Sequence, residues 1–176
     1  NNPDIFPLKG NNAKGREFYT PFQNYYNNGS YSPTPLSGFD IVATEDNTTI
    51  TIVPTKNLVG HPAGQAFTIT LNRGETWSGM ATSTAAAEHP AGTHIVSDKP
   101  ICITIKDDSM SNGGCRDLMG DQLIPIEHTG TDYIVMKGFL SGPDRVFVLA
   151  TEDNTEVFID GNATALGSLN RTEQLM

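Results

Sequence analysis

Oxygen ligands gather in one short stretch of the sequence. Asp107 and Asp108 directly follow the apolar run from Ile101 to Ile105, and two further carboxylates come a few residues later. Calcium takes six to eight oxygen ligands, which flexible loops often supply. The stretch therefore contains a candidate Ca²⁺ site, formed by Asp107, Asp108, Asp117 and Asp121. The alternative that stays open is a solvated acidic loop that binds no metal.

The two cysteines flank the same acidic stretch. Cys102 alternates with Ile101 and Ile103, so its side chain lies on the face of the strand opposite the isoleucines, where a returning loop can reach it. An even cysteine count in a chain of extracellular composition favours pairing. We therefore predict a disulfide between Cys102 and Cys115, with two free thiols as the alternative.

A third candidate site is aromatic. The segment from Asn24 to Gly38 is rich in Tyr, Asn and Pro and reads as a long exposed loop, where binding sites often lie. Flat aromatic rings stack on sugar rings as they do on other apolar faces, so Tyr25, Tyr26 and Tyr31 are candidate ligand-binding residues. For Trp77, on a predicted strand, packing in the core is the simpler interpretation.

No catalytic motif accompanies these candidates. The sequence has no Gly-x-Ser-x-Gly turn, no phosphate-binding loop, no His-Glu-x-x-His and no pair of cysteines with metal-ligand spacing. The histidines are scattered, and two precede Pro-Ala-Gly, so turn or surface positions are expected for them, with a zinc site assembled in space as the alternative. They are His61, His89, His94 and His128. We predict no catalytic residue.

Composition limits the class of protein. Lys and Arg total 11 against 20 Asp and Glu, a formal net charge of −9, which argues against binding nucleic acid or an anionic membrane. No apolar run is long enough for a membrane-spanning helix. Charged residues make up only 18% of the chain, and Thr, Ser, Asn and Gly are abundant. That balance is typical of secreted or cell-surface β-rich modules.

The elements that must position these residues are short strands. Runs of β-branched and aromatic residues alternate with Gly, Pro, Asn and Asp clusters, and Thr48 to Val53 places apolar side chains on one face and threonines on the other. The pattern predicts an all-β protein of antiparallel, β-sandwich-like units. The expected strands are 16–22, 39–44, 48–53, 66–71, 75–80, 93–97, 100–106, 122–127, 133–137, 145–150 and 155–160.

An internal repeat organises the strands. The hexapeptide Ala-Thr-Glu-Asp-Asn-Thr at Ala43 recurs 107 residues later at Ala150, and the flanking runs agree as well. Each copy joins two strand-like runs, which predicts two hairpin turns. The repeat divides the chain into an N-terminal extension, 1–14, a first β unit, 15–129, and the start of a second unit, 130–176.

Three segments together resemble the N-terminal domain of IgGFc-binding proteins: "GREFYTPFQN" at 15–24, "GTHIVSDKPICITI" at 92–105 and "DQLIPIEHTGTDYIV" at 121–135. Thr129 stands where that family often has Trp, and few cysteines remain, which indicates a bacterial cell-surface member. The resemblance implies a secreted β-repeat module engaged in binding or adhesion to an extracellular protein or glycan. It does not by itself imply a catalytic residue or affinity for immunoglobulin.

The sequence thus predicts an extracellular binding, adhesion or structural module without catalysis of its own. A carbohydrate-active enzyme domain is the alternative. Because the second unit stops at Met176, one of its sheet edges is expected to lack a partner strand. Either the chain is a fragment of a longer protein, which we favour, or a neighbouring copy supplies Asn1 to Lys14 and builds a filament, although Pro3 and Pro7 suit a strand poorly.

Overall fold

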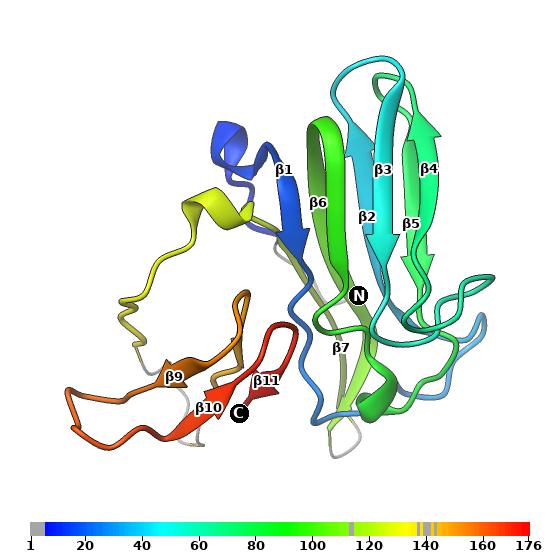
Figure 1. Cartoon of the computed structure of the whole chain (residues 1–176). Coiled ribbons are helices and arrows are strands. Elements are labelled where there is room, and N and C mark those ends of the chain that lie inside the picture. Colours follow the sequence, from blue (N-terminus) through cyan, green and yellow to red (C-terminus); the bar gives the residue numbers. More distant parts are fainter. Residues whose placement is uncertain (1–5, 113–114, 137, 139–141, 143) are drawn as a thin grey trace.

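The computed structural model describes residues 6–112, 115–136, 138, 142 and 144–176, and the side chains of Asn112 and Cys115 lie outside this description. The chain is all-β, as predicted, with only short 3-10 helices among the described residues (Figure 1). The strands are β1 (Gly15–Tyr19), β2 (Ser37–Ala43), β3 (Thr48–Val53), β4 (Phe67–Leu71), β5 (Thr76–Met80), β6 (His94–Asn112), β7 (Cys115–Gln122), β8 (Val148–Leu149), β9 (Thr155–Val157), β10 (Gly167–Leu169) and β11 (Gln174–Leu175). The 3-10 helices are η1 (Gly10–Ala13), η2 (Ala86–Glu88) and η3 (Ile126–His128).

The long strand β6 folds the main sheet into two layers. Residues 94–97 of β6 pair antiparallel with β3, whereas residues 101–107 pair antiparallel with β2. Because β2 and β3 run in opposite directions, β6 has to reverse between them, and it does so at Asp98, Lys99 and Pro100. Figure 1 shows β6 turning back at its upper end. One leg of β6 therefore belongs to each layer.

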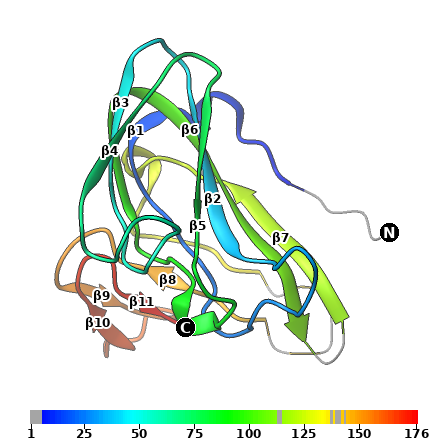
Figure 2. The same cartoon turned by 90° about the vertical axis from the view of Figure 1, so that its right-hand side faces the viewer.

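Each layer contains four antiparallel segments. One layer has the order β4-β3-β6-β1 and uses the first leg of β6; the other has the order β5-β2-β6-β7 and uses the second leg. Figure 2 shows β3 and β4 on one side of the molecule and β2, β5 and β7 on the other. The predicted antiparallel sandwich is thus observed for residues 15–122.

Alternation of side chains explains how the layers pack. In β3, Thr48, Ile50 and Ile52 are buried while Thr49 and Thr51 are exposed, so the isoleucines face the opposite layer. Burying each such side chain is worth about 1.5 to 3 kcal/mol. The core cluster is Phe18, Phe39, Ile41, Ala43, Ile50, Ile52, Leu58, Leu71, Ile95, Ile101, Ile103 and Leu123.

The two Glu-Asp-Asn turns have the same local structure but are not hairpins. Asn47 and Asn154 both have positive φ, 52° and 58°. In both turns the Thr hydroxyl after Asn donates to the Glu carbonyl, at 2.7 Å for Thr48 and 2.9 Å for Thr155. The prediction of hairpins is wrong because β2 and β3 belong to different layers, so each turn crosses from one layer to the other.

The C-terminal unit, residues 144–176, consists of two separate two-stranded sheets, β9 with β10 and β8 with β11. Several predictions of strands and loops after residue 112 are wrong. Strand β7 was expected as an acidic loop, and residues 122–127 contain η3 in place of a strand. The described residues of the expected strand 133–137 are not in a strand, and β10 and β11 were not predicted.

Candidate functional site

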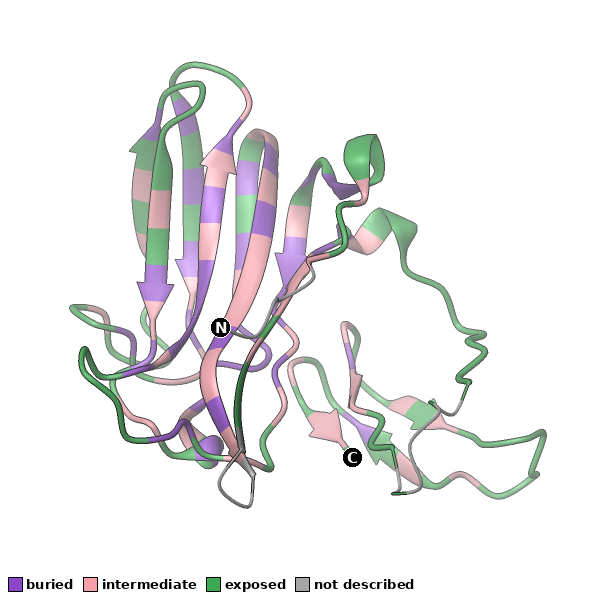
Figure 3. Cartoon of the chain, turned by 180° about the vertical axis from the view of Figure 1, so that it is seen from behind, coloured by how far each residue is buried: buried purple, intermediate pink, exposed green. Residues whose placement is uncertain are grey.

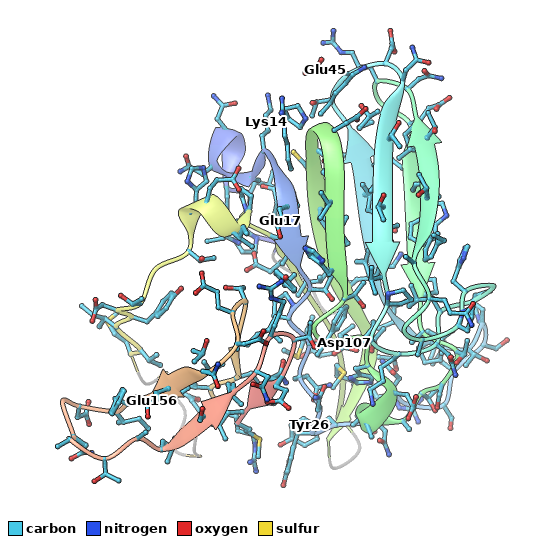
Figure 4. All side chains as sticks on the ribbon, viewed as in Figure 1. Lys14, Glu17, Tyr26, Glu45, Asp107 and Glu156 are labelled. Atoms are coloured by element: carbon cyan, nitrogen blue, oxygen red, sulfur yellow. The ribbon has the colours of Figure 1, made fainter. Side chains whose placement is uncertain are left out.

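A buried polar cluster lies at one end of the sandwich, where the loop after β1 meets β6. The carboxylate of Asp107 accepts hydrogen bonds from Gln23 Nε2 at 3.1 Å, from Asn28 Nδ2 at 3.2 Å and from the Ser37 hydroxyl. Both His89 and Asp107 are buried, and His89 Nδ1 lies 3.6 Å from Asp107 Oδ2. Figure 4 shows Asp107 at the end of the molecule that also carries Tyr26, opposite Glu45.

His89 is held by hydrogen-bond partners on the loop after β1. Its Nδ1 lies 2.7 Å from the Gln23 carbonyl oxygen, and its Nε2 lies 3.1 Å from Asn28 Oδ1. The Asn28 amide nitrogen donates to the Asp108 carbonyl, so Asn28 presents its oxygen to the histidine. Gln23 Nε2 also lies 3.1 Å from His89 Nδ1, so this nitrogen faces both an amide donor and a carbonyl acceptor. Asp107 and the loop after β1 therefore surround a buried imidazole. His89 lies in a turn, as expected, because its N–H donates to the Ala86 carbonyl and its own carbonyl accepts from the Ala91 N–H, but its side chain is buried and does not lie at the surface.

The predicted calcium ligands do not come together. The Asp107 oxygens are occupied by protein donors, and Asp121 forms an ion pair with Lys9. Asp117 is exposed on β7. Burial raises the pKa of Asp108, partly offset by Lys106 and reinforced by Asp107 and Asp40. Among the residues that the structure describes, no three His, Cys, Asp or Glu side chains are placed to hold a metal ion.

The predicted disulfide is also wrong in this structure. Cys102 is a free thiol, half-buried, and burial raises its pKa while Lys14 lowers it. Cys115 pairs through its backbone with Asn112, ten residues along β6 from Cys102. Ten extended residues span roughly 30 Å, whereas a disulfide needs Cα atoms within about 7 Å. The loop between the cysteines was expected to fold back, but β6 runs straight on through it.

The predicted aromatic site is partly formed. Tyr25 and Tyr26 pack edge to face with ring centroids 4.6 Å apart, and the Arg145 guanidinium lies 3.6 Å from the centre of the Tyr25 ring. Tyr31 is largely exposed. Trp77 packs against the core near Phe39, as expected. The aromatic loop therefore presents Tyr31 and part of Tyr25 to solvent.

Sequence reasoning missed a pocket of about 530 Å³ between the first layer and the C-terminal unit. The turn between β10 and β11 closes one side of it, and a Cβ at Gly92 would come within 2.5 Å of the Thr172 carbonyl oxygen. Its lining residues are Tyr19, Asn24, Val53, Pro54, Thr55, Lys56, Gly64, His89, Ala91, Gly92, His94, Arg171, Thr172 and Gln174. No acidic residue lines the pocket, although the whole chain carries a net charge of −9.

Two features of this lining favour a ligand. The ring of Tyr19 stacks on His94 with centroids 4.4 Å apart, and His94 Nε2 lies 2.8 Å from a Glu17 carboxylate oxygen, which holds the imidazole in place. Burial raises the pKa of Tyr19, while the nearby Arg171 guanidinium lowers it and forms a hydrogen bond with it. Gln174 Oε1 is buried without a hydrogen-bond partner, and such a group favours an incoming donor.

Together, these observations define an antiparallel β-sandwich module with a cation-lined pocket. The chain belongs to the IgGFc binding protein family, whose model matches residues 7–176. Neither the comparison with curated proteins nor that with solved structures found a match. Membership of this family indicates an extracellular binding module. Within the described residues, no helix is both long and apolar enough to span a bilayer.

Proposed function

We propose that this chain is a secreted or cell-surface binding or adhesion module, without catalysis of its own, that captures an acidic group of an extracellular protein or glycan. The observation that carries the proposal is the pocket, which Lys56 and Arg171 line without any acidic neighbour in the lining. An acidic ligand is repelled by the net negative charge elsewhere and is attracted locally here. The pocket therefore selects for a carboxylate.

The enzyme alternative has less support. Glycoside hydrolysis uses two carboxyl groups across a cleft, and the pocket lining contains none. Tyr25, Tyr26 and Tyr31 remain predicted sugar-stacking residues, and none of them lines the pocket. We assign the primary contact to the pocket because its cations and the buried, unpartnered Gln174 Oε1 belong to one lining.

Binding assays on a panel test this function. The panel contains glycans with and without uronic or sialic acid, together with the Fc fragment of IgG, for which the family is named. We expect Arg171→Gln to weaken binding to acidic ligands about tenfold, the loss of one charge-assisted hydrogen bond. Neutral glycans should bind weakly in both forms.

Arg73→Gln is the matched control. Arg73 occupies the corresponding position in the turn between β4 and β5, and its backbone N–H bonds Asp46 Oδ1 at 3.0 Å, as that of Arg171 bonds Asp153 Oδ1 at 3.0 Å. The side chain of Arg73 is not part of the pocket lining. Equal binding by both variants would contradict the proposal, as would turnover of any glycan in the panel.

We also propose that residues 15–129 and 130–176 are two copies of the same structural unit, preceded by an N-terminal extension, 1–14. The support is local. Strands β8 to β11 pair as β2 to β5 do, with Leu149 opposite Gln174 where Val42 is opposite Thr76. Thr155 is opposite Leu169, as Thr48 is opposite Leu71.

A further inference from the structure

Strand β6 completes both layers of the first unit. Its first leg lies between β3 and β1, and its second leg lies between β2 and β7. Without β6, the neighbouring edges of β2 and β3 would both present unpaired backbone groups on the same side of the unit. One segment that reverses direction therefore covers two edges.

The bend of β6 also holds the turn between β2 and β3. The Thr44 hydroxyl donates to the Pro100 carbonyl oxygen at 2.5 Å, and the Thr49 N–H donates to Asp98 Oδ1 at 2.8 Å. The Lys99 ammonium donates to the carbonyl oxygens of the turn itself. The sequence Asp-Lys-Pro thus supplies an acceptor and a cation that match this turn.

Within residues 144–176 the C-terminal unit has the same turn and the same edges, and none of these residues takes the place of β6. Strands β8 and β9 correspond to β2 and β3, and each pairs on one side only, with β11 and with β10. Thr151 occupies the position of Thr44, and its hydroxyl has no hydrogen-bond partner among the described residues. Both layers of this unit therefore end in an open edge beside a turn of matching chemistry.

Exposure of apolar side chains follows from the missing segment. Phe39 and Ile52 are fully buried in the first unit, whereas their counterparts Val146 and Ile159 are 43% and 50% exposed. Figure 3 shows the C-terminal unit mostly in the colours of intermediate and exposed residues, beside a sandwich that alternates with buried ones. The two units are alike beside their Glu-Asp-Asn turns, since Ala43 and Ala150, which precede these turns, are both buried.

The segment that corresponds to β1 also lacks a partner strand. In the first unit, β1 pairs only with β6. The matching sequence from Gly130 has no strand structure, and Tyr133 and Ile134 are 70% and 95% exposed, while the corresponding Phe18 and Tyr19 are buried. A strand whose one partner is missing has no ladder to join, which explains why residues 130–136 stay irregular.

We propose that the C-terminal unit is an acceptor for a polypeptide segment of the β6 type, supplied from outside residues 1–176. The segment has two short strands with aliphatic residues at alternate positions, joined by an Asp-Lys-Pro bend. Its legs extend β8 and β9 and draw residues 130–136 into a strand. The occupant is not β6 of a second copy, because that strand is buried in its own sandwich. This proposal uses the repeated design and not the pocket.

The probe is a synthetic peptide with the sequence of residues 92–107 and Cys102→Ser, added to the 176-residue protein. Hydrogen exchange followed by mass spectrometry locates its binding. When the peptide is bound, we expect the backbone amides of residues 130–136, 146–150 and 155–159 to exchange at least about tenfold more slowly than in the free protein. Peptides with Asp98→Ala and Lys99→Ala together should bind about tenfold more weakly, because both contacts to the turn are lost.

A variant of the protein checks the turn itself. Thr151→Ala should weaken peptide binding about fivefold, the effect of one hydrogen bond, whereas Thr164→Ala, exposed in the loop before β10, should not. Protection confined to residues 37–53, or equal binding by the doubly substituted peptide, overturns the proposal. Protection of 146–159 that rises with protein concentration in the absence of peptide also overturns it, because a second copy is then the occupant.

Discussion

At the residue scale, Asp107 shows why a site predicted from the sequence can differ from the site in the structure. The sequence predicted a calcium ligand, whereas the structure places this carboxylate among internal hydrogen-bond donors. Asp107 was identified as a candidate ligand, but the residues that surround it are far from it in sequence, at Gln23, Asn28 and His89. A carboxylate at the end of a strand is equally compatible with metal binding and with internal hydrogen bonding. Only long-range packing distinguishes the two, and a single sequence does not contain it.

Asp107→Asn should destabilise the protein by about 3 kcal/mol. The substitution replaces a carboxylate oxygen by an amide donor, which then faces the donors of Gln23, Asn28 or Ser37 and leaves buried polar groups unsatisfied. Urea unfolding of both proteins measures the difference. Asp117→Asn, at an exposed position on β7, is the control and should change stability by less than about 0.5 kcal/mol. A similarly small change for Asp107→Asn would show that the hydrogen bonds to this carboxylate do not stabilise the fold.

At the scale of elements, alternation predicted most strands of the first unit well. Thr48 to Val53 and Phe67 to Leu71 form strands with the expected faces. The failures share a cause. Strand β7 is polar and owes its structure to pairing with β6, while the expected strand at 133–137 has suitable residues and no partner. Intrinsic strand propensity is weak, and available edges decide the outcome.

Asn47 offers a test of the turn between layers. Its φ of 52° is a left-handed conformation that Asn and Gly adopt more easily than other residues. Asn47→Ala should lower the free energy of unfolding by about 1 kcal/mol, and Asn47→Gly should leave it nearly unchanged. Thermal and urea unfolding of the two variants provide the comparison. Equal destabilisation by Ala and Gly would mean that the Asn side chain, not the backbone angle, is the important feature.

At the scale of the whole molecule, the sequence predicted two similar turns but not how the segments around them meet, and the division into two repeated units stays a prediction. The hexapeptide repeat located both turns, and the structure gives them the same hydrogen bonds. The pocket could not be predicted, because its lining combines positions near 19, 55, 92 and 171 that approach only after both parts fold. The sequence carries no signal for this site, because its two cations, Lys56 and Arg171, lie far apart along the chain.

A protease should cut the link between the parts before it cuts the paired strands of the first unit. Residues 129–136 are exposed, and Tyr133 is 70% exposed in an irregular segment. Brief chymotrypsin digestion should therefore cleave after Tyr133 before it cleaves after Phe39 or Trp77, which lie in paired strands. Mass spectrometry of the early fragments identifies the site. Early cleavage inside 37–80 would contradict the observed difference in order between the two parts.

The position of β6 also governs the sequence of events during biosynthesis. Strands β1, β2 and β3 all need a segment that begins at His94, so none of them can complete its ladder until the chain has emerged beyond about residue 107. Contacts of such large sequence separation close slowly, and open edges invite aggregation in the meantime. The first unit can therefore order its two layers only after β6 has emerged from the ribosome, and the two layers then form together.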